Sequence, residues 1–125
     1  MKSIIVSMMA AAGLMVAGGV LATDMPDAAK KNGCTACHAI DKKVVGPAWM
    51  DVSKKYKGAT KYKYSNNGSD APDAKEYPLE EGLIMKVSKG GHGNWGSVPM
   101  IANDPSGSKQ ADIKGLVEFV LGLAK

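Results

Sequence analysis

Two cysteines and a histidine stand together in the motif Cys34-Thr35-Ala36-Cys37-His38, and the chain has no other cysteine. The pattern C-x-x-C-H is the attachment signature of a c-type haem. Two thiols three positions apart on one helical turn can both add to the vinyl groups of one porphyrin. The adjacent imidazole then faces the iron. We therefore expect one haem c, with Cys34 and Cys37 forming its thioether bonds and His38 binding its iron.

Three other interpretations of this motif are weaker. A plain disulfide or a thioredoxin-like redox pair would need a strand before it and a helix after it, whereas residues 27–32 are typical of a helix. A zinc site would have to use the one other histidine, His92, and the adjacent Cys37 and His38 cannot easily both face one tetrahedral ion. Chance is disfavoured by the export signal at the N-terminus.

Residues 1–22 have the features of a secretory signal peptide. A short positive start is followed by an uncharged apolar run from Ile4 to Leu21, and Val20-Leu21-Ala22 suits a signal peptidase. We predict cleavage after Ala22, which leaves one domain at residues 23–125 and places it in the periplasm. The alternative is an uncleaved anchor, since an apolar run of this length could nearly span a bilayer.

Composition excludes several classes of protein. The chain is 125 residues long, with one phenylalanine and no continuous β-branched pattern. A large catalytic domain, a sheet-rich barrel and a membrane transporter do not fit these features. All 16 basic residues are lysine, and arginine supplies the commonest base contact and the bidentate grip on phosphate. The sequence therefore argues against nucleic-acid binding.

Hydrophobic periodicity predicts four helices and no confident strand, so we expect an all-α domain wrapped around one haem. The predicted helices are about Pro26–Gly33, a segment from Gly46-Pro47 to Gly58, a segment from Pro78 to Gly90-Gly91, and a segment from about Ser108 to the end. Ser108 can cap the last helix. Between the second and third helices, residues 59–77 are rich in turn-forming residues, which predicts a long surface loop.

Met100 is the strongest candidate for a sixth ligand to the iron. It lies in a predicted loop between the third and fourth helices, where Pro99 and Pro105 stiffen the chain. The other methionines beyond the signal segment are Met25, Met50 and Met85. The first is too close to the attachment motif, and the other two lie on helices, where methionine usually fills the core. His92 and an open sixth position, as in a haem enzyme or gas sensor, are the alternatives.

These motifs together resemble the small class I cytochromes c of the bacterial periplasm, short monohaem proteins that donate electrons to nitrite reductase or terminal oxidases. The matching segments, in chain order, are 33–41, Val45-Gly46-Pro47-Ala48, Trp95-Gly96, Val98-Pro99-Met100 with Asn103, and Phe119-Val120-Leu121. The C-x-x-C-H element alone is shared by all c-type cytochromes, but this combination is much more specific.

The resemblance implies a role for each matching residue. His38 would donate its second ring N–H to a backbone carbonyl, that of Pro47, which fixes the ring and tunes the metal. Trp95 would donate its indole N–H to a haem propionate, and Asn103 would hold the Met100 sulfur and its loop. Packing and turn formation are the alternatives for the last two residues. The protein would be a one-electron carrier with His/Met ligation rather than an enzyme.

Two features depart from the family pattern. Ala28 and Ala29 stand where family members often have an aromatic residue that packs against the last helix, so we expect a looser contact that Phe119 partly fills. The segment 59–77 is also longer than in the shortest members.

Positive charge is concentrated after the attachment motif. Nine lysines and two aspartates lie between Lys30 and Lys63, whereas three lysines and six acidic residues lie between Tyr64 and Asp104. The lysines closest to the motif are Lys42, Lys43, Lys54, Lys55 and Lys57. If they surround the exposed haem edge, they would steer an acidic redox partner; a solvated lysine face is the alternative. Redox encounters are small and transient, so we expect a monomer.

Overall fold

The computed structural model describes residues 24–124, so the predicted signal peptide and its cleavage site lie outside the described residues. The helical elements are α2 (Asp27–Lys31), the 3-10 turn η1 (Cys34–Ala36), α3 (Trp49–Lys55), α4 (Leu79–Lys89) and α5 (Gln110–Gly122). The strands are β1 (Lys61–Tyr64), β2 (Lys75–Pro78), β3 (Gly91–Gly93) and β4 (Gly96–Met100). Over this range, no helix is long and apolar enough to cross a bilayer.

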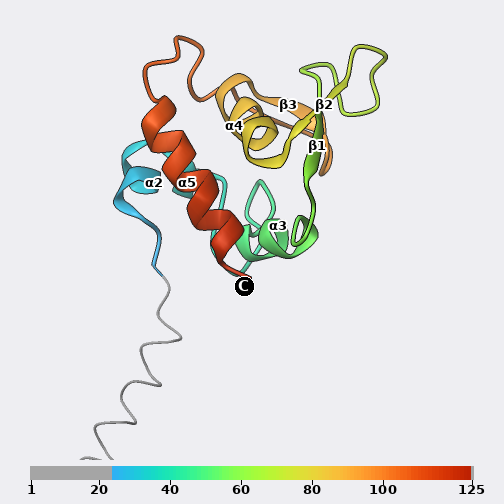
Figure 1. Cartoon of the computed structure of the whole chain (residues 1–125). Coiled ribbons are helices and arrows are strands. Elements are labelled where there is room, and N and C mark those ends of the chain that lie inside the picture. The colour runs from blue at the N-terminus through green and yellow to red at the C-terminus, as the bar shows by residue number, and fades with distance from the viewer. Residues whose placement is uncertain (1–23, 125) are drawn as a thin grey trace, which may run out of the picture.

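The long helix α5 organises the fold by packing against α2, α3 and α4 (Figure 1). Its apolar residues recur at helical spacing and bury one broad face. The four α-helices within residues 24–124 confirm the predicted mostly helical domain, whereas the expectation of no confident strand was wrong. Two small antiparallel hairpins, β1–β2 and β3–β4, stand beside α4.

The prediction of a surface loop at 59–77 was wrong at both of its ends. Tyr62 pairs with Tyr77 in the β1–β2 hairpin, and the side chains of Tyr62 and Tyr64 are buried. The sequence Lys-Tyr-Lys-Tyr of β1 alternates with a period of two, which turns the tyrosines inward and the lysines to solvent. Only residues 65–74 between the strands form a loop.

The core has two parts. We call the first the tyrosine cluster; its buried members are Tyr56, Tyr62, Tyr64, Leu83, Ile113 and Val117. We call the second the attachment cluster; its buried members are Ala29, Trp49, Leu116 and Val120, and Cys34 packs against it. Both clusters take residues from α5, so this helix couples the two parts of the core.

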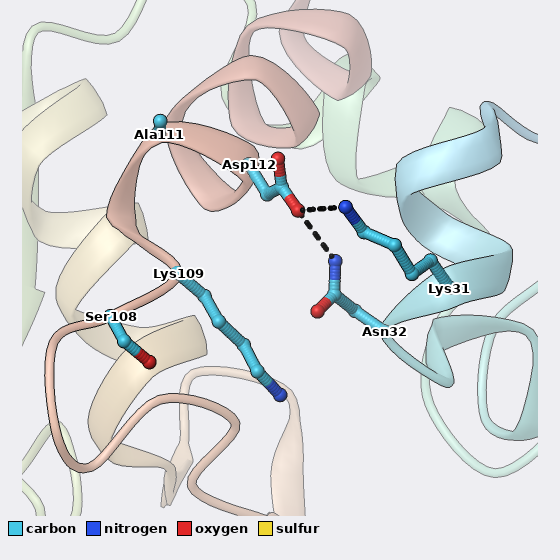
Figure 2. A pocket seen from close by; sticks show the side chains of 6 residues that line it. All are labelled: Lys31, Asn32, Ser108, Lys109, Ala111 and Asp112. Atoms are coloured by element: carbon cyan, nitrogen blue, oxygen red, sulfur yellow. Dashed lines mark hydrogen bonds and ion pairs between the residues drawn. The ribbon is translucent and has the colours of Figure 1, made fainter.

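Helix α2 meets α5 through a small side chain and a polar bridge. Ala29 is completely buried in this contact, and Phe119 packs against the same cluster. Beside it, Lys31 Nζ lies 3.1 Å from Asp112 Oδ2, and Asn32 Nδ2 donates to the same oxygen at 3.2 Å (Figure 2). These contacts lower the pKa of Asp112, chiefly through its bond to Lys31. Helix α2 is thus held to α5 both by the buried Ala29 and by the ion pair and hydrogen bond to Asp112.

The cap of α5 differs from the prediction. The helix begins at Gln110, two residues beyond Ser108. Ser108 Oγ instead accepts a hydrogen bond from Ser106 Oγ at 3.1 Å. The backbone N–H of Lys109 donates to Asp104 Oδ2 at 2.9 Å, so a carboxylate five residues away satisfies a donor at the helix start. The prediction failed because the capping side chain comes from Asp104, several residues before the helix, and not from the residue next to its first turn.

Candidate haem-attachment site

The attachment motif occupies the turn that follows α2. Gly33 has φ +76°, a left-handed conformation that favours glycine, and it lets the chain leave α2 and enter η1. Cys34 O accepts hydrogen bonds from the N–H groups of Cys37 and His38, at 3.1 and 2.9 Å. The motif is therefore one tight turn. Both cysteines are free thiols and only half-buried, and burial raises the pKa of Cys34.

A second segment wraps back over this turn. The N–H groups of Val45 and Gly46 both donate to Cys37 O, at 3.2 and 2.8 Å, and Trp49 N donates to Ala39 O at 2.9 Å. These bonds tie the segment 45–49 to the attachment motif. The two sequence motifs that are separated along the chain thus form one unit in space.

The His38 ring is held tightly within this unit. Its Nδ1 donates to Pro47 O at 2.8 Å. Because a carbonyl oxygen only accepts, Nδ1 carries a proton, and in the neutral imidazole Nε2 is then the nitrogen whose lone pair can bind a metal. A Cβ added to Gly46 would lie 2.5 Å from His38 Cε1, which explains the need for glycine here. The Trp49 ring lies 5.8 Å from the imidazole, centroid to centroid. The imidazole is therefore oriented to present Nε2.

The residues of this turn fit a haem. Two free thiols lie next to an imidazole whose Nδ1 is held by a carbonyl oxygen, which leaves Nε2 as the nitrogen that can bind iron. Large apolar side chains are also exposed on the neighbouring segment, at Val44 and Val45, and on the segment around Met100, at Val98 and Ile101. Exposed apolar side chains gathered on such segments indicate surface that a bound group or a partner covers.

Met100 lies in a hairpin instead of the predicted loop. It is the last residue of β4 and pairs with Gly91 of β3, and it is half-buried. The chain crosses closely over the end of α4, since a Cβ on Gly90 would lie 2.5 Å from Met100 O. Strand pairing therefore fixes the backbone on one side of Met100.

Asn103 holds the chain on the other side of Met100. Its side-chain amide donates to Val87 O and to Ile101 O, both at 3.2 Å, and its backbone N–H donates to Val87 O at 3.1 Å. The two carbonyls account for both N–H donors of the amide. The predicted bond to the Met100 sulfur would have to replace one of them.

Trp95 lies in the turn of the β3–β4 hairpin and is 38% exposed. Lys55 from the end of α3 donates to Asn94 O at 2.6 Å and places its Nζ 4.4 Å from the centroid of the Trp95 ring. Lys55, expected to steer a partner, is therefore also a contact that orients Trp95.

His92, the alternative ligand, lies on the exposed side of β3. A Cβ on Gly68 would lie 3.0 Å from His92 Cε1, so the imidazole packs against the 65–74 loop. Within residues 24–124, no three His, Cys, Asp or Glu side chains gather closely enough to hold a metal ion.

Lys86 is a candidate residue that the sequence analysis missed. It is only 9% exposed, and no acidic group among the described residues pairs with it. Desolvation lowers its pKa. The signal was present in the sequence, because Lys86 falls three residues after Leu83 on the apolar stripe of α4. A largely buried lysine side chain whose charge has no partner suits a bound anion.

Comparisons with known proteins agree with the motif. The family model described as cytochrome c matches residues 26–124. Cytochrome c-551 of Allochromatium vinosum is 40% identical over 95 residues, which cover 76% of this chain and 81% of that protein. Cytochrome c-552 of Nitrosomonas europaea is 37% identical over 123 residues, 98% of this chain and 99% of that protein.

The fold also matches a solved structure. The crystal structure of wild-type Nitrosomonas europaea cytochrome c552 superimposes with a TM-score of 0.55 at 36% sequence identity. The match covers 78% of this chain and 96% of the other.

Proposed function

Because the chain belongs to the cytochrome c family and binds haem c through Cys34 and Cys37, we propose that it carries single electrons in the periplasm, with His38 and Met100 as axial ligands. When bound, the haem iron supplies the redox chemistry by cycling between its ferric and ferrous states. The chain is an electron-transport haem protein and not an enzyme. The observation that carries the proposal is the His38 ring, fixed by Pro47 O with Nε2 free beside both thiols.

His38 and Met100 perform different tasks in this proposal. The bond from His38 to Pro47 O makes the imidazole a stronger and better oriented ligand. The thioether of Met100 favours the ferrous state, which raises the reduction potential and suits an electron carrier. The chain supports Met100 by strand pairing with Gly91 and by the bonds of Asn103. The ring of the competing ligand His92 is occupied with packing against Gly68.

The visible spectrum of the ferric protein tests this ligation. We expect the weak long-wavelength band of sulfur-to-iron charge transfer in the wild type and in the control His92→Ala. Met100→Ala should lose the band and keep the covalent haem. A wild-type spectrum without the band, or a band lost in His92→Ala alone, would contradict ligation by Met100.

We further propose that Trp95 and Lys86 serve the haem propionates. The indole of Trp95 is oriented by Lys55, and Lys86 offers a positive charge, at the end of a largely buried side chain, that the described acidic residues leave unpaired. A propionate supplies the counter-charge that a buried amine needs. In this proposal both residues bind and orient the haem without taking part in chemistry.

The proposed location and partners follow from the sequence. Cleavage after Ala22 would release residues 23–125 into the periplasm, and the N-terminal sequence of the mature protein tests this directly. The lysines at 42, 43, 54, 55 and 57 are all exposed and would steer an acidic redox partner, such as a nitrite reductase or terminal oxidase, in brief encounters. We expect the electron-transfer rate to fall steeply with added salt; a flat dependence would contradict steering.

A further inference from the structure

The segment that follows Met100 is fastened to the last turn of α4. The backbone N–H groups of Asn103 and Asp104 donate to Val87 O and Ser88 O, both at 3.1 Å. Ile101, between Met100 and these bonds, is 72% exposed. The position of Met100 therefore depends on how firmly the chain is held at residues 103 and 104.

Three side chains extend this attachment to α5. Asp104, only 4% exposed, accepts through Oδ2 from the backbone N–H of Lys109 at 2.9 Å and from Gln110 Nε2 at 2.8 Å. Gln110 Nε2 also donates to Ser88 Oγ at 2.8 Å, and Ser88 is buried on α4. We call Ser88, Asp104 and Gln110 the Asp104 latch. It joins α4, the segment after Met100 and the start of α5.

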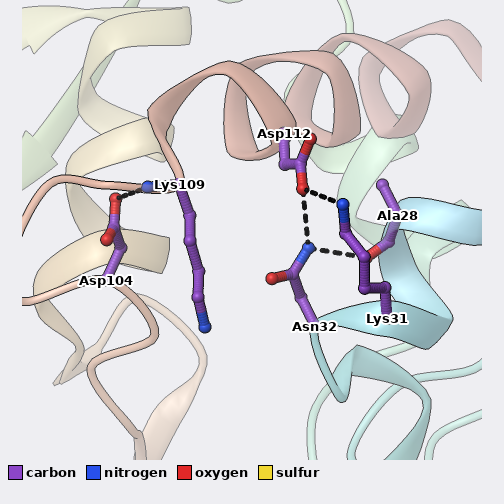
Figure 3. A network of polar contacts seen from close by, with 6 residues as sticks. All are labelled: Ala28, Lys31, Asn32, Asp104, Lys109 and Asp112. Atoms are coloured by element: carbon purple, nitrogen blue, oxygen red, sulfur yellow. Dashed lines mark hydrogen bonds and ion pairs between the residues drawn. The ribbon is translucent and has the colours of Figure 1, made fainter.

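The latch is separate from the polar network that Asp112 of α5 forms with α2. Figure 3 shows Asp104 meeting the backbone of Lys109 on one side, while Asp112 meets Lys31 and Asn32 on the other. One carboxylate near the start of α5 therefore holds the Met100 segment, and another holds α2. This division supplies a matched control for any substitution in the latch.

We propose that Asp104 is a positioning residue for the sixth iron ligand, because the latch limits how far the Met100 thioether can withdraw from the iron. The inference rests on the proposed ligation by Met100. An added anion such as cyanide binds ferric iron only after the sulfur has left, so its binding rate reports how often the segment opens. Each lost hydrogen bond should raise that open population several-fold, and two lost bonds should raise it about tenfold.

The test compares cyanide binding to the ferric holoprotein in three variants. Asp104→Ala removes both bonds of Oδ2, and we expect binding about tenfold faster than in the wild type, with a weaker sulfur-to-iron band. Asp104→Asn should bind cyanide faster than the wild type but more slowly than Asp104→Ala. Its amide oxygen can accept the bonds of Oδ2, but its NH2 group takes the buried position of Oδ1, which has no partner among the described residues. Asp112→Asn should lose stability with an unchanged cyanide rate.

Two results would overturn the latch: Asp104→Ala binding cyanide at the wild-type rate, or Asp112→Asn accelerating binding equally. If Asp104→Ala does not fold, Gln110→Ala replaces it. Gln110 is exposed and alanine favours helix. This variant loses the bonds from Nε2 to Ser88 Oγ and to Asp104 Oδ2, but Asp104 keeps its bond from Lys109 N. Because Asp104 itself loses only one of its two bonds, we expect cyanide binding about threefold faster; an unchanged rate would count against the latch. A wild-type spectrum without the sulfur band would instead contradict ligation by Met100 itself.

Discussion

The two parts of the core are built in different ways. Around the attachment cluster, residues 33–49 form a compact unit through bonds between neighbours in sequence, such as Gly46 N to Cys37 O. The tyrosine cluster instead joins α3, β1, α4 and α5, which lie far apart along the chain. The comparison teaches that His38 is positioned by bonds between close neighbours in sequence, whereas the segment after Met100 is held by bonds to α4 and Trp95 is held by Lys55 of α3.

Removing the Tyr62 ring should destabilise the tyrosine cluster and leave the haem-attachment unit, residues 33–49, intact. Its ring lies in the tyrosine cluster, 5.4 Å from Tyr56 between ring centroids, and against Gly82 of α4. We expect Tyr62→Ala to lower the free energy of unfolding by about 3 kcal/mol, measured by urea denaturation of the holoprotein. Covalent haem content should not change.

Tyr62→Phe is the matched control, since it keeps the ring and loses only the hydroxyl. It should cost about 1 kcal/mol or less. If Tyr62→Ala destabilised the protein no more than Tyr62→Phe, the tyrosine cluster would not be a major source of stability.

Gly46→Ala should disturb the haem-attachment unit, residues 33–49. The new Cβ would lie 2.5 Å from His38 Cε1, so the imidazole or the backbone must move and the bond to Pro47 O weakens. We expect a loss of about 2 kcal/mol in unfolding free energy, with an altered absorption spectrum of the haem. Gly115→Ala on α5 has no atom within 4 Å of the new Cβ and should stabilise by up to about 1 kcal/mol.

The contrast between the two parts also explains what the sequence predicted. The thiols, the imidazole and the Pro47 segment lie within fifteen positions of one another, so their spacing alone predicted one site. The strand β1 was missed because four residues of Lys-Tyr alternation are a short signal beside many turn residues. Lys86 was missed because α4 was assigned from its apolar members, and its burial depends on how the helix packs.

Lys86→Met should change the haem electrostatics more than the fold. Removing a buried positive charge favours the ferric state, so we expect a lower reduction potential, by an energy of about 1 kcal/mol. The pKa of the propionate should rise, because its carboxylate loses a counter-charge. The pH at which the reduction potential changes with propionate ionisation should rise with it. Voltammetry across pH measures both effects. Lys89→Met, exposed on the same helix, should change little; equal effects in the two variants would contradict the proposed propionate contact.

Acid should loosen the contact between α2 and α5. The pKa of Asp112 is depressed in the folded protein, chiefly by Lys31. Its contribution to stability is present above the pKa of an unfolded aspartate and is lost as the pH falls through the folded pKa. We therefore expect the stability difference between wild type and Asp112→Asn, from urea denaturation, to be largest at neutral pH and to shrink in acid. A difference that grew in acid would contradict this assignment.

The smallest effects should show whether a lysine at the end of α3 steers a redox partner, orients Trp95, or does both. Lys54 and Lys55 are both exposed, but only Lys55 contacts Asn94 O and the Trp95 ring. Each change to methionine removes one charge, so both should reduce equally the salt dependence of electron transfer to an anionic oxidant. Only Lys55→Met should also lose about 0.5–1 kcal/mol of stability, the value of an exposed cation–π contact. If both variants were equally stable, Lys55 would act on partners alone and would not orient Trp95.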